Sequence, residues 1–248
     1  KTLTDETYDV AVVGAGTAGT AAALHCARRD LGVVCIDRLP LDEAGARWVN
    51  GVPAGAFDEA EIARPEPPER LAGGQDFHLV AGWGPRRTTV SDHDLLEVDM
   101  RALVDRLQSE SVEAGARLVG EVDVSGLEPD GLHTSEGVVD ARYFVDAAGL
   151  AGPGLLGQPR PRRSDICAAA QQVRKVTDPR GAVDYFERHD SRPGDTLCFA
   201  GIAGGYSILN VRIDDGHVSL LTGSIPGDGH PSGRRMLEDF AEREPWIG

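Results

Sequence analysis

Three glycines near the start of the chain have the spacing at which a backbone loop can bind phosphate groups. They are Gly14, Gly16 and Gly19. Glycine at the first position permits a tight turn, and at the second it leaves the backbone open to a pyrophosphate. At the third it lets a helix pack closely on a strand. Asp37 follows at about the 20-residue distance typical of the acidic side chain that binds a ribose diol. These four residues predict a dinucleotide site.

The segments around the glycines have the composition of a strand, a turn and a helix. An apolar strand is predicted over residues 8–13, a helix that starts at the glycine turn and continues over 20–28, and a second apolar strand over 33–36. The unpaired N–H groups and the positive dipole end of a helix N-terminus favour phosphates. The predicted cofactor-binding loop comprises Gly14, Ala15, Gly16, Thr17, Ala18 and Gly19.

Charge and cysteine content argue against several classes of function. The formal net charge is −15 over 248 residues, which disfavours binding to nucleic acid or to an anionic membrane. The four cysteines form no Cys-x-x-Cys pair, so we expect no metal centre and no redox dithiol. We see no signal peptide and no apolar run that could form a stable membrane span, and we expect a cytoplasmic protein.

The middle of the chain alternates between broken and periodic segments. Prolines and glycines interrupt residues 38–68, where we expect a long loop. In this loop Arg47, Trp48 and Asn50 are candidates to face a ligand, and a solvated surface excursion is the equal alternative. After the loop we predict strands near 77–90 and an amphipathic helix over 95–115, with Ser91 or Asp92 as the N-cap of that helix. Further strands are predicted over 117–119, 121–124 and 138–146, with a hairpin turn at Asp130-Gly131.

A cluster of glycines and prolines after residue 150 marks a boundary between two domains. Beyond it we expect antiparallel strands over residues 168–173, 182–186, 196–199, 206–211 and 217–222, then a helix over 234–243. We therefore predict an α/β protein. Residues 1–155 would form a doubly wound, Rossmann-like domain with a small β-meander, and residues 156–248 an incomplete β-sheet-rich substrate domain, to which the strands near 77–90 could contribute.

Three features together resemble one superfamily. They are the glycine turn with Asp37, the helix and strand over residues 95–122, and the segment Phe144–Gly149, which reads Phe-Val-Asp-Ala-Ala-Gly. This combination is similar to the FAD-dependent oxidoreductases that include aromatic hydroxylases, geranylgeranyl reductases and flavin-dependent halogenases. The resemblance covers residues 8–150 well and the remainder in outline.

The resemblance implies a set of FAD contacts. Asp37 would bind the adenosine ribose, Arg38 would lie along the adenine, and the backbone near Val122 would meet the adenine ring. Ala148 and Gly149, at the end of the Asp-Ala-Ala-Gly segment, would pass beneath the flavin, where glycine permits close backbone approach.

The chain also departs from the family pattern. Met100 stands where many members have a cofactor-binding arginine, and the tryptophan motif of the halogenases is absent around Tyr206, which disfavours halogenation. The family's third cofactor motif, Gly-Asp-Ala, is also missing, and the nearest similar residues, Gly227–Gly229, read as a loop. These departures leave open a fragment, or one half of a split enzyme whose flavin site a second polypeptide completes.

The resulting functional expectation is FAD-dependent, monooxygenase-like oxidoreduction of an organic small molecule, with NAD(P)H as the external reductant. No side chain stands out as a catalytic acid or base, because in such enzymes the flavin carries the redox chemistry. The alternatives are an NAD(P)-dependent dehydrogenase and a non-catalytic nucleotide-binding subunit. The long segment over residues 38–94 and the Asp146–Gly149 strand end argue against the dehydrogenase.

Overall fold

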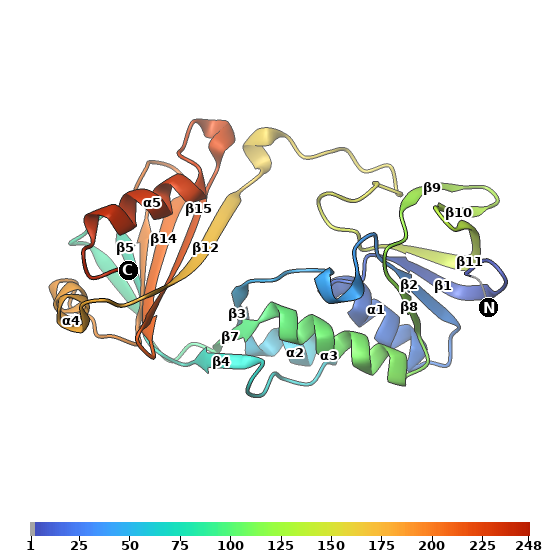
Figure 1. Ribbon diagram of the computed structural model, residues 1–248, viewed down its shortest axis with the longest axis horizontal. Coiled ribbons are helices and arrows are strands. Elements are labelled where there is room, and N and C mark those ends of the chain that lie inside the picture. The colour runs from blue at the N-terminus through green and yellow to red at the C-terminus, as the bar shows by residue number, and fades with distance from the viewer. Residues whose placement is uncertain (1–2) are drawn as a thin grey trace. The chain divides into compact units, whose positions relative to one another are not determined.

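The computed structural model describes residues 3–248, which fold into two compact units (Figure 1). The first unit consists of two segments of the chain, the described residues up to Gly73 and Asp94–Pro159. The second unit contains Gly74–His93 and Arg160–Gly248. Each unit therefore has two chain segments, and the chain passes between the units three times.

The first unit is built on a six-stranded sheet in the order β8-β2-β1-β11-β10-β9. The four strands β8, β2, β1 and β11 run parallel, and β11, β10 and β9 form an antiparallel meander. Their bounds are β1 Thr7–Val13, β2 Val33–Ile36, β8 Arg117–Val119, β9 Val124–Glu128, β10 Gly131–Thr134 and β11 Gly137–Asp146. This is the Rossmann-type α/β architecture with a β-meander that the sequence predicted.

Two helices and a small sheet complete the first unit. Helix α1 (Thr17–Ala27) follows β1 and packs on β1, β2 and α3 (Met100–Glu113). The small antiparallel sheet has the order β3-β7-β4, and its neighbouring elements are short. The bounds are 3-10 helix η1 Leu41–Glu43, β3 Val49–Pro53, α2 Ala54–Glu59, β4 Arg70–Gly73 and β7 Leu95–Asp99. Residues 38–68, predicted as a loop, thus contain elements too short for a periodicity to reveal.

The predicted helix over residues 95–115 was wrong in its first part, because Leu95–Asp99 is strand β7. Val98 is fully buried in the strand between β3 and β4. The apolar residues of this segment therefore pack within a sheet and do not form the buried face of a helix. The N-cap is Asp99, whose carboxylate accepts hydrogen bonds from the N–H groups of Arg101 (3.0 Å) and Ala102 (3.4 Å). The predicted caps, Ser91 and Asp92, lie well before the helix.

The second unit contains a six-stranded sheet in the order β12-β15-β14-β13-β5-β6. Strand β5 pairs in parallel with β13, so the hairpin over residues 77–90 is part of this sheet. Helices α4 (Pro179–Arg188) and α5 (Gly233–Arg243) contribute side chains to the core beneath it. The remaining bounds are β5 Phe77–Ala81, β6 Arg87–Val90, η2 Arg163–Asp165, β12 Ala168–Lys175, β13 Thr196–Ala200, β14 Ser207–Asp214, β15 His217–Ser224 and η3 Pro226–Asp228.

Two strand predictions fail for local reasons. Residues 182–186 lie in helix α4, which begins with Pro179 and is capped by Asp178, and which buries Ala182, Tyr185 and Phe186 at helical spacing. A proline at the first helical position and an aspartate before it are start signals for a helix. Residues 121–124 are mostly irregular, because Glu121 takes the left-handed conformation (φ 61°) and β9 begins only at Val124.

Candidate functional site

The glycine turn between β1 and α1 requires glycine at its first and third positions. Gly14 has φ +104°, and a Cβ atom there would lie 2.3 Å from the carbonyl oxygen of Ala147. A Cβ atom at Gly19 would lie 1.7 Å from the carbonyl oxygen of Gly14. Both contacts are with backbone atoms, so no side-chain rotation could relieve them. These two glycines therefore let β1, α1 and the end of β11 meet at one point.

Gly16 has a neighbour that the sequence did not predict. A Cβ atom at Gly16 would lie 3.0 Å from the Cα atom of Gly45, which itself takes the left-handed conformation (φ +79°). The two backbones touch because both residues lack side chains. Gly16 thus allows a second stretch of backbone to approach the loop.

The N-terminus of α1 has no side-chain cap. Gly16 occupies the cap position in an extended conformation, and Thr20 donates its hydroxyl to the Gly16 carbonyl oxygen at 2.7 Å. Thr17 is half-buried and Ala18 is exposed, so the first turn is accessible to a ligand. An uncapped helix N-terminus offers its N–H groups to an anion, which fits a pyrophosphate.

The Asp37 carboxylate lies against the loop, where it organises backbone amides. Its Oδ2 atom accepts a hydrogen bond from the Ala15 N–H at 2.7 Å, and its Oδ1 atom accepts one from the Leu39 N–H at 2.9 Å. Each oxygen has a second lone pair, so the same carboxylate can also accept from a ribose hydroxyl. Arg38 beside it is exposed. Val122 is buried, and its N–H donates to the Asp37 carbonyl oxygen at 3.0 Å.

The end of β11 reaches the same edge of the sheet because β11 pairs in parallel with β1. Val13 is in register with Asp146, and the Ala147 N–H donates to the Val13 carbonyl oxygen at 2.8 Å. The Asp146 carboxylate then accepts from the N–H groups of Ala148 (3.2 Å) and Leu155 (3.0 Å), which orders the following turn. Gly149 in this turn has φ +69°.

The structure thus brings most of the predicted cofactor residues to one edge of the first sheet. The glycine loop, Asp37 and the Ala147–Gly149 turn meet there, at the carboxyl ends of β1, β2 and β11. In open α/β sheets this edge is where nucleotides bind. Arg47, Trp48 and Asn50 have exposed side chains, and their proposed role in facing a ligand stays a prediction.

Sequence reasoning missed Gly45 and Gln108. The Gln108 side chain, on α3, donates to the carbonyl oxygens of Ala15 (3.1 Å) and Leu41 (2.9 Å). Nothing in the local pattern of α3 distinguishes this glutamine from a solvent-facing polar residue. Only its contacts with residues far away in the chain reveal its position.

The thiol of Cys35 lies against the glycine loop, and burial favours its protonated form. Burial, followed by the charge of Asp37, raises the pKa of Cys35 from 9.0 to about 12. Its Sγ atom lies 3.5 Å from the Gly14 carbonyl oxygen, to which it donates. Because a thiol rather than a thiolate is present at neutral pH, Cys35 is a packing residue of this site and not a nucleophile.

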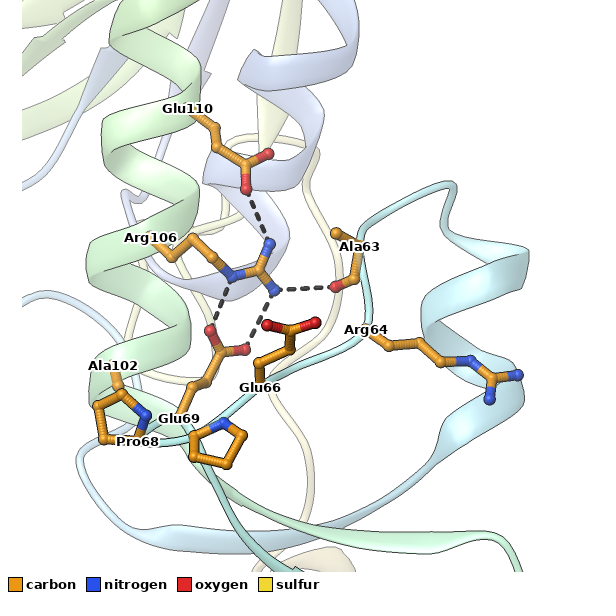
Figure 2. Close-up of a pocket in the computed structure, with 9 residues that line it drawn as sticks. Ala63, Arg64, Glu66, Pro68, Glu69, Ala102, Arg106 and Glu110 are labelled. Carbon is orange, nitrogen blue, oxygen red and sulfur yellow. Dashed lines mark hydrogen bonds and ion pairs between the residues drawn. The ribbon is translucent and has the colours of Figure 1, made fainter.

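A second feature of the first unit is a groove of about 460 Å³ beside α3 (Figure 2). Arg106 at its centre donates to both carboxylate oxygens of Glu69, at 2.7 and 3.0 Å, and to Glu110 at 2.8 Å. Its remaining contact is with the Ala63 carbonyl oxygen at 3.0 Å. All of these partners are protein groups, so the network fastens residues 63–69 to α3.

Comparison with known proteins agrees with this geometry. Residues 9–68 match the family model described as an FAD binding domain. This range covers the glycine loop, Asp37 and Gly45. Over these residues the chain is similar to the FAD binding domain of that family.

This chain is similar to distant and longer proteins. It is 30% identical to the L-aspartate oxidase of Streptomyces coelicolor over 57% of the chain and 24% of that protein. It is 25% identical to protein FixC of Salmonella typhi over 97% of the chain and 61% of that protein. Among solved structures it is similar in fold to a geranylgeranyl bacteriochlorophyll reductase-like protein from Thermoplasma acidophilum, with a TM-score of 0.75, 19% identity, and coverage of 97% of this chain and 63% of that one. The chain thus spans less than two thirds of each of these proteins.

Across residues 3–248, the helices are all too short or too polar to cross a membrane.

Proposed function

We propose that this protein is an FAD-dependent oxidoreductase that acts on an organic small molecule. The observation that carries the proposal is the preformed loop between β1 and α1, with an uncapped helix N-terminus beside a carboxylate. When bound, FAD would supply the redox chemistry, as a hydride or electron carrier.

Different residues of the first unit would bind different parts of FAD. The N–H groups of the first turn of α1 would bind the pyrophosphate, and Asp37 would accept hydrogen bonds from the adenosine ribose. Arg38 and the backbone at Val122 would border the adenine. The turn at Ala148 and Gly149 would support the flavin end, because the left-handed glycine there leaves its backbone uncovered.

We further propose NAD(P)H as the reductant and a reducing, cytoplasmic environment. All four cysteines are free, which is consistent with a compartment in which thiols stay reduced. The resemblance to aromatic hydroxylases and geranylgeranyl reductases supports NAD(P)H.

The proposal predicts that the purified chain is yellow, or becomes yellow when FAD is added, and that mass spectrometry identifies the released cofactor as FAD. Gly19→Ala should abolish FAD retention, because the new Cβ atom would meet the Gly14 carbonyl oxygen at 1.7 Å. Gly51→Ala is the matched control, since no atom lies within 4 Å of the added Cβ. Anaerobic addition of NADH or NADPH should then bleach the flavin absorption of the wild type.

Two results would contradict the proposal. A folded wild-type chain that does not bind FAD would remove the cofactor assignment. Retention of FAD by Gly19→Ala at wild-type stoichiometry would show that the cofactor binds somewhere other than the glycine loop. If both nicotinamide nucleotides leave the flavin oxidised, only the reductant assignment is wrong.

A further inference from the structure

We infer that Gln108 is a positioning residue for the cofactor loop, an inference that rests on the proposed FAD site. Gln108 contacts no cofactor-binding side chain. It acts through the backbone, by joining the glycine loop to the segment that carries Gly45. Its two hydrogen bonds, to the carbonyl oxygens of Ala15 and Leu41, connect residues that are 26 positions apart in the chain.

The chemistry of a primary amide suits this position. A glutamine nitrogen carries two N–H donors, and here each donor meets one carbonyl oxygen. The opposite orientation of the amide would place its oxygen against two carbonyl oxygens, which cannot donate. The network therefore determines which atom of the amide faces the loop.

Ala15 is consequently held on both sides. Its N–H, in the peptide group shared with Gly14, donates to Asp37 at 2.7 Å, and its carbonyl oxygen, in the peptide group shared with Gly16, accepts from Gln108 at 3.1 Å. Neither of these two peptide planes can rotate without losing a hydrogen bond. The second plane leads directly into Gly16, so its orientation sets where the first turn of α1 begins.

The second hydrogen bond of Gln108 holds the neighbouring segment against the loop. Leu41 begins η1, and Gly45 follows four residues later at the Gly16 backbone. A Cβ atom at Gly45 would lie 2.9 Å from the Gly16 Cα and 3.1 Å from a methyl carbon of Val104. Val104 lies one turn before Gln108 on α3, so one face of this helix supports both backbones.

The inference has a consequence for affinity. If the loop is ordered before FAD arrives, binding does not have to order it. Replacing Gln108 by Met keeps a similar length and removes both donors. We expect FAD to bind at least about tenfold more weakly, since each lost hydrogen bond corresponds to roughly a fivefold change.

The matched control is Ser111→Ala on the same face of α3. Ser111 is buried and donates to the carbonyl oxygens of Thr20 (3.0 Å) and Leu107 (2.6 Å), so it joins α3 to α1 without reaching the glycine loop. This variant should lower the thermal midpoint while its FAD dissociation constant stays within about twofold of the wild type. A role of Gln108 in general stability alone would make the two variants behave alike.

The experiment is a fluorescence titration of FAD with the wild type, Gln108→Met and Ser111→Ala. It is paired with hydrogen exchange of the peptide covering residues 13–20 in the cofactor-free chain. We expect faster exchange of this peptide in Gln108→Met than in Ser111→Ala. Gln108→Asn, which keeps the amide but is one methylene too short, serves as the second variant if Gln108→Met does not fold.

The outcomes separate the two proposals. Wild-type FAD affinity in Gln108→Met would overturn the inference and leave the proposed function intact. Failure of the wild type to bind FAD would overturn the proposed function. The exchange of residues 13–20 would then decide the inference by itself, because unchanged protection in the Gln108 variant would show that the side chain does not hold the loop.

Discussion

At the scale of single residues, burial distinguishes Cys35 and Cys198 from the exposed Cys167 in their expected reactivity. Burial raises the pKa of Cys35 to about 12 and that of Cys198 to about 11, whereas Cys167 is exposed. The raised pKa values favour the thiol form in the folded state. Their contribution to stability is therefore present below the unfolded pKa of 9.0 and is lost as the pH rises toward 11 and 12.

We predict that a disulfide exchange reagent at pH 8 modifies Cys167 rapidly in the folded chain and modifies Cys35 and Cys198 only in denaturant. The thiolate is the reactive species, and a pKa of 12 leaves on the order of one thiolate in 10⁴ at pH 8. Mass spectrometry of the labelled peptides identifies the site. Cys167→Ser should lower the amplitude of the fast phase, and prompt labelling of Cys35 would contradict the packing role assigned to it.

At the scale of elements, α3 is the support of the first unit. One side of it holds the glycine loop through Gln108, and another fastens residues 63–69 through Arg106. Hydrogen bonding to Glu69 is the main reason that the pKa of Arg106 is raised, while burial acts in the opposite direction. The ion pair with Glu69 contributes to stability because the glutamate, at 7% exposure, is buried and would otherwise lack a charged partner.

We predict that Arg106→Met lowers the free energy of unfolding by about 2 kcal/mol, since it leaves the buried Glu69 carboxylate without its charged partner. The figure is below the 3–5 kcal/mol typical of a buried pair because the Arg106 side chain is itself 25% exposed. Urea unfolding measures the change. The control is Arg64→Met, whose pair with Asp58 is exposed and whose loss should not change the midpoint.

The double variant Arg106→Met, Glu69→Gln tests the reason given for that loss. Removal of the buried charge should recover part of the stability, because an amide costs less to bury without a partner than a carboxylate does. A double variant less stable than Arg106→Met would show that the charge itself is not what destabilises the single variant.

At the scale of the whole molecule, the chain order and the structural units do not coincide. The hairpin β5–β6 lies between two segments of the first unit but belongs to the sheet of the second. Val80 of β5 is 2% exposed and joins the same core as Phe199 and Phe240. The second unit therefore depends on a strand encoded almost 80 residues before its main segment.

We predict that Val80→Ala destabilises the second unit by about 2 kcal/mol, from two buried methyl groups and the cavity that they leave. Hydrogen exchange of β13 should become faster, while exchange in β1 and β2 of the first unit stays unchanged. Leu79→Ala is the control on the same strand, because Leu79 is 44% exposed. Equal effects of the two substitutions, or loss of protection in β1, would contradict the assignment of Val80 to the core of the second unit alone.

The glycine loop shows how far local pattern reaches. Gly14, Gly19, the flanking strands and α1 were predictable because steric demands within some 30 consecutive residues determine them. The hairpin at Asp130-Gly131 and the strands β12 to β15 other than their exact ends followed from the same short-range rules. Two failures, at β7 and α4, arose where an apolar run suits either a strand or a helix and the partners decide between them.

The sequence alone therefore determined the glycine loop between β1 and α1, the α/β class of the first unit and the resemblance to FAD-dependent oxidoreductases. These depend on backbone conformations and residue spacings that residues close together in the chain determine. Only the tertiary structure placed Gly45 on Gly16, Gln108 beneath Ala15, and β5 beside β13. Such contacts join residues that are tens to more than a hundred positions apart, and their energies arise from surfaces that meet only after folding.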